Sequence, residues 1–116
     1  MIRSLVLLIL LLGSIATARA DTHADAEIQA LIQAVAESDC EFNRNGSLHS
    51  AEMAAEHLEL KYARGKRYAD SAEAFIERLA SKSSWSGKPY HMICDGQAQP
   101  TGDWLTATLQ DIRATE

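Results

Sequence analysis

The sequence predicts a mainly α domain of about four short helices, with a short two-stranded β ribbon and one disulfide. Three observations support this fold class. Apolar residues recur at helical spacing in four separate segments of the chain. Two short segments, near Cys40 and near Cys94, lack that spacing and have the character of extended chain. These two residues are also the only cysteines among the 116 residues.

Residues 1–20 have the pattern of a secretory signal peptide. A basic residue precedes an apolar run at positions 5–12, and residues 18–20 read Ala-Arg-Ala, which fits the small-x-small rule for cleavage. The apolar run is shorter than the ~18–20 residues that span a bilayer. We therefore expect an exported, periplasmic protein without a membrane span after cleavage, in which residues 21–116 form a single small helical domain.

The first helix is predicted from about Asp25 to Ser38, with Thr22 or Asp25 as its N-cap. Polar and acidic residues separate the apolar positions, as in an amphipathic helix. The predicted buried face has the spacing i, i+3, i+4 and i+7 and consists of Ile28, Leu31, Ile32 and Val35. A coiled coil is excluded, because a single apolar repeat of about two turns is too short.

The extended segments are expected to be joined by a Cys40–Cys94 disulfide, the simplest state of two cysteines in an exported chain. The bond would close a loop of roughly 55 residues, which the chain-entropy model values at about 4 kcal/mol. A redox-active or metal-binding pair is the alternative, and the absence of a Cys-x-x-Cys spacing disfavours it. Residues around Cys40 would pair with residues 90–94 as the β ribbon, and Asn45-Gly46 is a strong turn signal after the first of them.

Two more helices are predicted between the cysteines. Ser50 can cap a helix over residues 50–63, which Gly65 ends. Asp70 and Glu73 have the spacing of a capping box and open a third helix. The residues expected on its buried face are Ala72, Phe75, Ile76 and Leu79.

The last helix is predicted to follow a loop at residues 97–102 and to start at Thr101 or Asp103. Its apolar residues recur at helical spacing, so they should form one buried stripe. The stripe consists of Trp104, Leu105, Leu109 and Ile112.

The chain is acidic, with 16 Asp and Glu against 11 Lys and Arg and a formal net charge of −5. Loss of the predicted signal peptide would remove Arg3 and Arg19 and no acidic residue, so the remaining domain would be more acidic still. We expect no nucleic-acid partner, because clustered Lys and Arg dominate binding to phosphates. The one local basic run, residues 64–67, is interpreted as a solvated turn.

Three groups of residues, in order along essentially the whole chain after residue 20, carry a family resemblance. They are Ser38-x-Cys40-x-Phe42-x-Arg44-Asn45-Gly46 with Glu52, His57-Leu58 and Lys61-Tyr62, then Phe75-Ile76 with Ser83-Ser84-x-Ser86-Gly87-Lys88-Pro89-Tyr90 and Cys94, then Trp104-Leu105 with Leu109 and Arg113. This set resembles the YfeK-like proteins of Gram-negative bacteria. The resemblance implies a small exported domain of unknown function and transfers no activity. Asn43 departs from it, since an apolar residue is expected there, and this weakens the strand prediction at Phe42.

The least generic stretch is the run from Ser81 to Cys94, and its part from Ser83 to Tyr90 concentrates Ser, Trp, Gly, Lys, Pro and Tyr in one constrained turn. We interpret it as the contact surface of a non-enzymatic binding module, because aromatic anchors carry most interface energy. The partner would be an unknown periplasmic protein or a cell-wall component. The candidate binding residues are Ser84, Trp85, Ser86, Gly87, Lys88 and Tyr90, together with Arg44, Asn45 and His57.

Two alternative functions remain open. The pattern Ser86-Gly87-x-x-Tyr90 resembles the loop that periplasmic inhibitors insert into c-type lysozyme, which would make the chain an inhibitor of a cell-wall hydrolase. That inhibitor family is a β-barrel, whereas this chain is predicted to be mainly helical. The other alternative is a small hydrolase that uses His57 as a general base for one of the serines. No Gly-x-Ser-x-Gly nucleophile elbow is present to support it.

No metal or cofactor site is expected. His49 and His57 are eight residues apart, about 12 Å along a continuous helix, which is too far for one ion. The pair Gly87-Lys88 is not a phosphate-binding loop, because no glycine stands five residues before Gly87. No catalytic residue is therefore assigned from the sequence.

Overall fold

The computed structural model describes residues 13–116, and their side chains from Thr22 onward. Of the predicted signal peptide, residues 1–12 lie outside the described part of the chain and residues 13–20 lie in its first helix. Its cleavage therefore stays a prediction. Within the described part, no helix is both long and apolar enough to cross a membrane.

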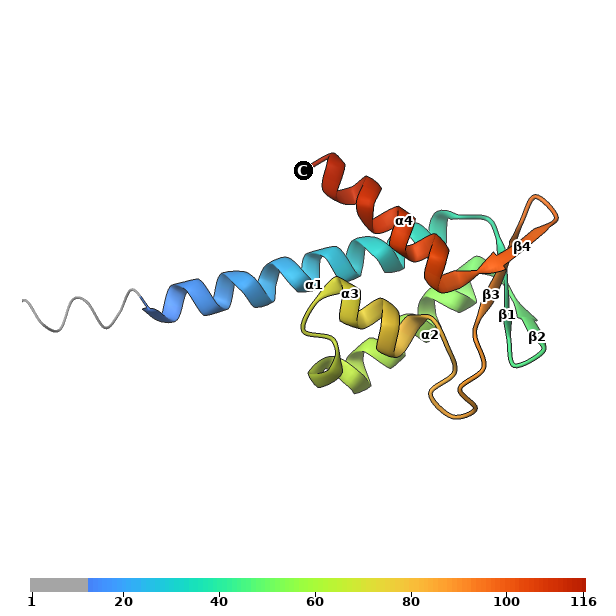
Figure 1. Cartoon of the computed structure of the whole chain (residues 1–116), viewed down its shortest axis with the longest axis horizontal. Helices are drawn as coiled ribbons and strands as arrows, with labels where there is room; N and C mark the ends of the chain where they lie inside the picture. The colour runs from blue at the N-terminus through green and yellow to red at the C-terminus, as the bar shows by residue number, and fades with distance from the viewer. Residues whose placement is uncertain (1–12) are drawn as a thin grey trace, which may run out of the picture.

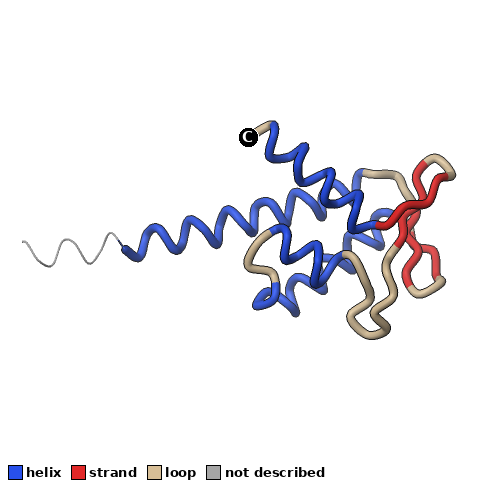
Figure 2. The backbone as a smooth tube through the Cα atoms, viewed as in Figure 1, coloured by secondary structure: helices blue, strands red, loops and turns tan. Residues whose placement is uncertain are grey.

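Four α-helices and four short strands make up the described fold (Figure 1). The helices are α1 (Gly13–Glu37), α2 (Ala51–Gly65), α3 (Ala72–Phe75) and α4 (Thr101–Ala114), with a 3₁₀ turn at Lys66–Tyr68 and a π-helical turn at Ile76–Ala80 directly after α3. The strands are β1 (Glu41–Arg44), β2 (Ser47–His49), β3 (His91–Cys94) and β4 (Gln97–Pro100). The sheet lies at one end of the helices, and the start of α1 projects from the other end (Figures 1 and 2).

The sheet is larger than the predicted two-stranded ribbon, because each expected strand is one half of a hairpin. All pairs are antiparallel, in the order β2-β1-β3-β4. The turns Asn45-Gly46 and Asp95-Gly96 both adopt positive φ, at 52° and 86° and at 52° and 80°, as two-residue hairpins with this sequence do. Residues 97–100, predicted as a loop, therefore return as β4 beside β3.

The predicted disulfide is confirmed. Cys40 and Cys94 are bonded with a Cα–Cα distance of 4.7 Å. The bond follows from the strand register, because Glu41 pairs with Ile93 in the central β1–β3 ladder and the cysteines come one position further along. Phe42 pairs with Met92 in the same ladder and is buried, so the departure at Asn43 does not break the strand.

Two helix starts differ from the sequence prediction. The first helix has no cap at Thr22 or Asp25, because α1 already runs from Gly13. The Asp25 carboxylate instead accepts a hydrogen bond of 2.7 Å from the Tyr62 hydroxyl of α2. The third helix is capped by Ser71, whose side chain accepts from the Ala74 amide, and not by Asp70.

The predicted apolar faces form one core between the helices and one face of the sheet. Tyr62 packs edge-on against Phe75, with ring centroids 5.7 Å apart. Trp104 and Ile112, expected in the buried stripe of the last helix, are only partly buried against this core. Its largest fully buried apolar side chains are Phe75, Ile28, Leu31, Met92, Leu105 and Val35.

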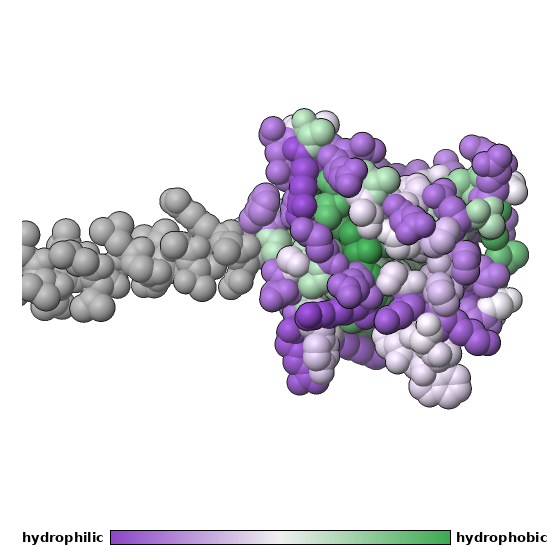
Figure 3. All heavy atoms as spheres, viewed as in Figure 1, coloured by the Kyte–Doolittle hydropathy of each residue, from purple (hydrophilic) through white to green (hydrophobic). Residues whose placement is uncertain are grey.

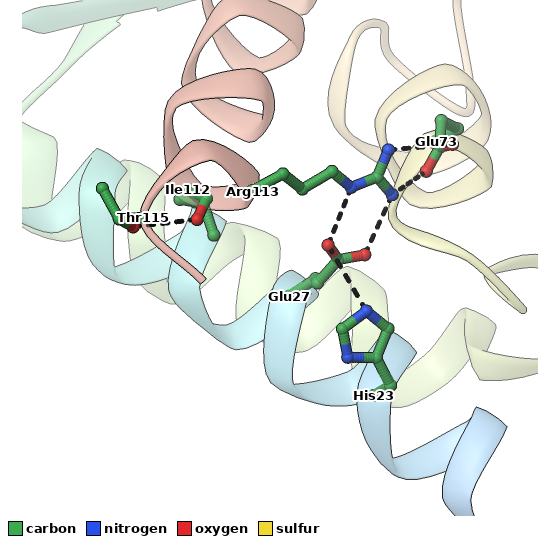
Figure 4. A network of polar contacts seen from close by, with 6 residues as sticks. All are labelled: His23, Glu27, Glu73, Ile112, Arg113 and Thr115. Carbon is green, nitrogen blue, oxygen red and sulfur yellow. Dashed lines mark hydrogen bonds and ion pairs between the residues drawn. The ribbon is translucent and has the colours of Figure 1, made fainter.

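A three-residue ion cluster ties together three helices that are distant in sequence (Figure 4). Arg113 of α4 donates to the Glu27 carboxylate of α1 through Nε at 2.8 Å and Nη2 at 3.0 Å. The same guanidinium donates to Glu73 of α3 at 2.6 and 3.3 Å. Glu27 is almost fully buried, yet the bond from Arg113 holds the pKa of its carboxyl below the usual value. The cluster is thus the polar anchor of α4.

Candidate functional site

The serine loop, residues 83–88, is a closed turn built on the buried Ser83 side chain. The Ser83 hydroxyl accepts from the amides of Trp85 and Ser86, at 3.3 and 3.1 Å. The Ser83 carbonyl accepts from the Gly87 amide at 3.0 Å, and the Ser83 amide donates to the Lys88 carbonyl at 2.9 Å. Gly87 has a φ of +75°, which a residue with a side chain adopts only at a cost. These bonds make the loop the rigid turn that its serines predict.

The turn between β1 and β2 holds the serine loop from the side. Asn45, at the corner of that turn, accepts a hydrogen bond of 2.7 Å from the Ser86 hydroxyl and donates to the Ser83 hydroxyl at 3.4 Å. The prediction that Asn45 belongs with the loop residues is therefore consistent with their contacts. Two segments about 40 residues apart in sequence meet here.

The two aromatic residues of the predicted contact surface have opposite environments. The Trp85 side chain is 95% exposed, so it projects from the serine loop into solvent. Tyr90 is only 6% exposed, so it does not project into solvent as Trp85 does, although it lines the cleft described below. The backbone explains this, because the Tyr90 amide donates to Ser81 and its carbonyl accepts from Thr101, which fixes the residue beneath the loop.

Tyr90 links two polar side chains of α2 below the loop. Lys61 donates to the Tyr90 hydroxyl at 3.1 Å and to the Lys82 carbonyl at 3.0 Å. The His57 Nε2 atom lies 3.4 Å from the same hydroxyl. Since an ammonium group only donates, the Tyr90 oxygen accepts from Lys61 and keeps its own proton for a neutral His57.

Burial and positive neighbours shift the ionisation of both α2 side chains. Burial, followed by the charges of Arg44 and Lys61, lowers the pKa of His57 to about 4. Burial and Arg44 lower the pKa of Lys61 to about 8. At neutral pH His57 is therefore uncharged, and Lys61 is a half-buried cation.

Lys61 opens onto a wide cleft of about 1020 Å³ between the serine loop, α2 and the π-helical turn. We call it the basic cleft, because its lining, among the residues that the structure describes, includes five Lys and Arg residues and no Asp or Glu. These five are Arg44 of β1, Lys61 and Arg64 of α2, Arg78 of the π-helical turn, and Lys82 before the loop. None of them forms an ion pair with the part of the chain that the structure describes. An acidic chain thus gathers an unpaired positive surface beside its most exposed aromatic residue.

Eight of the nine candidate binding residues line the basic cleft, all except Lys88, but four of its five Lys and Arg residues were not among the candidates. Arg64 was interpreted as part of a solvated turn, but it lines the cleft, whereas Lys66 and Arg67 of the same run do not. One signal was available, because His57, Lys61 and Arg64 stand at i, i+4 and i+7 and so share one face of α2. Arg78 and Lys82 had no local signal, since only the tertiary fold places them there.

The hydrolase alternative finds no support in the hydrogen bonds of His57. Its partner is the Tyr90 hydroxyl, and the Ser83 and Ser86 hydroxyls are engaged with Asn45 and the loop amides. Within residues 22–116, no serine hydroxyl hydrogen-bonds to His57. A general base needs that contact, directly or through one water.

A second group of ionisable side chains lies far from the loop. One ligand atom each of His23, Glu27 and Glu116 lies within 4.8 Å of the others. Glu27 already accepts hydrogen bonds from Arg113 on both carboxylate oxygens, so a metal ion there would compete with that guanidinium. The expectation that the chain has no metal site stays a prediction.

We predict that His57 makes the fold sensitive to acid. Its pKa is about 4 in the folded chain and near 6.5 when unfolded, so the unfolded chain binds the extra proton between these values. Stability should therefore fall as the pH drops from 6.5 to 4. Between pH 7 and pH 4.5, the melting temperature of His57→Gln should fall by less than that of the wild type. Equal losses in the two proteins would show that His57 does not cause the effect.

Comparison with known proteins gives a family and no activity. Residues 22–113 match a model described as a family of unknown function, DUF5329. The uncharacterized protein YfeK of Salmonella typhimurium (strain LT2) is 44% identical over 82 residues, which cover 70% of this chain and 68% of that protein. No solved structure matches the chain. The resemblance to YfeK-like proteins that the motifs indicated is confirmed.

Proposed function

Because this chain belongs to the DUF5329 family, whose function is unknown, its relatives supply no activity, and we propose from its surface that it is an exported, non-enzymatic binding module. The serine loop and Trp85 form the contact surface. Its partner is a periplasmic protein or a cell-wall component.

The observation that carries the proposal is a fully exposed indole on a rigid loop. Trp85 is 95% exposed, while the loop that bears it is closed by bonds to Ser83 and braced by Asn45. Tryptophan is the residue type most enriched among the anchors of binding sites. A preformed loop also loses little conformational entropy on binding, which favours affinity. The loop is therefore suited to recognition.

Export is supported by two features. A disulfide is typical of oxidising compartments, and Cys40 and Cys94 are joined by one. The N-terminal sequence has the pattern of a signal peptide. Together they favour the periplasm as the place where the loop meets its partner.

The geometry disfavours both alternative functions. A lysozyme inhibitor of the Ser-Gly-x-x-Tyr type would need to present Tyr90, which is buried and hydrogen-bonded to Lys61. A hydrolase would need His57 at a serine hydroxyl, and its partner is Tyr90. Binding is the function that the exposed groups support best.

The test compares two exposed apolar side chains. Trp85→Ala should weaken binding to purified cell walls or to immobilised periplasmic proteins by about tenfold or more, because it removes the central anchor. Leu48→Ala is the control, since Leu48 is exposed on β2 and does not line the basic cleft. Co-sedimentation measures binding to the cell walls, and retention on the immobilised periplasmic proteins is the second arm of the test. The proposal is wrong if the wild type binds in neither arm, or if Trp85→Ala binds as the wild type does.

A further inference from the structure

We propose that the basic cleft is the binding site for an acidic glycan, with Trp85 as the platform for one of its sugar rings. This inference rests on the proposed function and names the chemical class of its ligand. It follows from three properties of the described surface: the sign of its charge, the engagement of its main chain, and the position of the indole.

The charge of the cleft selects an anion. Five Lys and Arg residues line it without any Asp or Glu, although acidic residues outnumber basic ones in the chain. A cleft lined by one sign of charge concentrates ligands of the opposite sign. Arg44 and Arg64 add planar guanidinium groups, which can bind a carboxylate through two hydrogen bonds.

Lys61 is the cation that gains most from a bound anion. It is half-buried, and within residues 22–116 its three donors reach only the Lys82 carbonyl and the Tyr90 hydroxyl, with the Tyr90 ring centroid 5.0 Å away. A buried charge is costly unless an opposite charge offsets it. A carboxylate in the cleft would supply that charge beside Lys61.

Most main-chain donors of the serine loop are already used. Five of its six amides donate within the loop itself, and these are the amides of Ser83, Trp85, Ser86, Gly87 and Lys88. Capture of a peptide by added β-pairing needs a strand edge with a row of free main-chain groups, whereas residues 84–86 form a turn, so this wall of the cleft is unsuited to it. Recognition here is by cations, an indole and hydroxyl groups.

The indole completes the match to a sugar. Trp85 lines the cleft and is almost fully exposed, so a flat apolar face stands beside the positive lining. Figure 3 shows the loop as a pale projection from a mostly hydrophilic surface, at the lower right of the view. A sugar ring has an apolar C–H face that packs on an aromatic ring and hydroxyls at its edge. A carboxylated sugar joins both features in one residue.

The test measures binding of defined oligomers by calorimetry at low ionic strength, where exposed charges are least screened. The probes are tri-galacturonic acid, its fully methyl-esterified form, and a glutamate tripeptide. The wild type should bind the acidic sugar about tenfold more tightly than either of the other two, because only it offers both carboxylates and sugar rings.

Two double variants locate the site. Arg64→Gln/Lys82→Gln removes two exposed cations of the cleft, and Lys66→Gln/Arg67→Gln removes the same charges outside it. The first should weaken binding of tri-galacturonic acid about tenfold, and the second should leave it near the wild-type value.

Four results would overturn the inference. Equal affinity for tri-galacturonic acid and its methyl ester would show that the cleft does not recognise the carboxylate charge. Equal affinity for tri-galacturonic acid and the glutamate tripeptide would show that the cleft does not recognise the sugar ring. Equal losses in the two double variants would place the site elsewhere. If none of the three probes binds, but the protein still binds cell walls or periplasmic proteins through Trp85, the acidic glycan is rejected as the ligand. The proposed function then still holds.

Discussion

Replacing Cys40 and Cys94 together by alanine is expected to lower the free energy of unfolding by about 4 kcal/mol. The bond joins residues 54 positions apart, so its loss frees a long loop in the unfolded chain. That loop contains α2, α3 and the serine loop, which is most of the candidate site. For a domain with a total stability of about 5–15 kcal/mol this is a large share.

Urea denaturation of the double variant and of the wild type measures the difference. Wild type reduced with dithiothreitol is the second arm, because it keeps every side chain and reports the bond alone if the variant fails to fold. A loss below about 1 kcal/mol in both arms would contradict the role that we give to the disulfide.

Arg113→Met is expected to destabilise the fold strongly, because it leaves the Glu27 carboxylate buried without its cation. Glu73→Gln is the control, since Glu73 is 63% exposed and its loss leaves Arg113 paired with the buried Glu27 carboxylate. Chemical denaturation should show a clearly larger loss for Arg113→Met than for Glu73→Gln.

The double variant Arg113→Met/Glu27→Met separates packing from charge. Removing both partners of a buried pair is often close to neutral, so this protein should recover most of the stability that Arg113→Met loses. A double variant no more stable than Arg113→Met would show that Arg113 acts by packing alone.

Acid should also affect the wild type through Glu27, because the pKa of its carboxyl is lowered in the folded chain. The contribution of the Glu27 pair to stability is therefore lost as the pH falls below about 4.5.

Local patterns in the sequence were enough to predict the helices and the covalent link. The spacing of Ile28, Leu31 and Val35 predicts a buried face, and the structure buries all three completely. The second hairpin was missed although Asp95-Gly96 is as strong a turn signal as Asn45-Gly46. The apolar run before this turn predicts one strand, and the polar residues after it predict a loop. The prediction therefore gave too little weight to the turn signal at Asp95-Gly96.

The site could be predicted only in part, because it is assembled from segments far apart in the chain. The bond pattern of Ser83 follows from a local serine-rich turn, and the sequence indicates it. The burial of Tyr90 depends on hydrogen bonds to Ser81 and Thr101, and no local pattern distinguishes it from the exposed Trp85. The basic cleft likewise needs the fold to bring β1, α2 and the π-helical turn together.

The most direct test of the binding surface is an amide NMR titration of the wild type with tri-galacturonic acid. We predict that the largest shifts fall on the serine loop, the Trp85 indole N–H and the amides of residues 44–45 and 61–64. Shifts confined to α1 and α4, or no shifts at saturating ligand, would contradict the assignment of the basic cleft and its loop as the site of recognition.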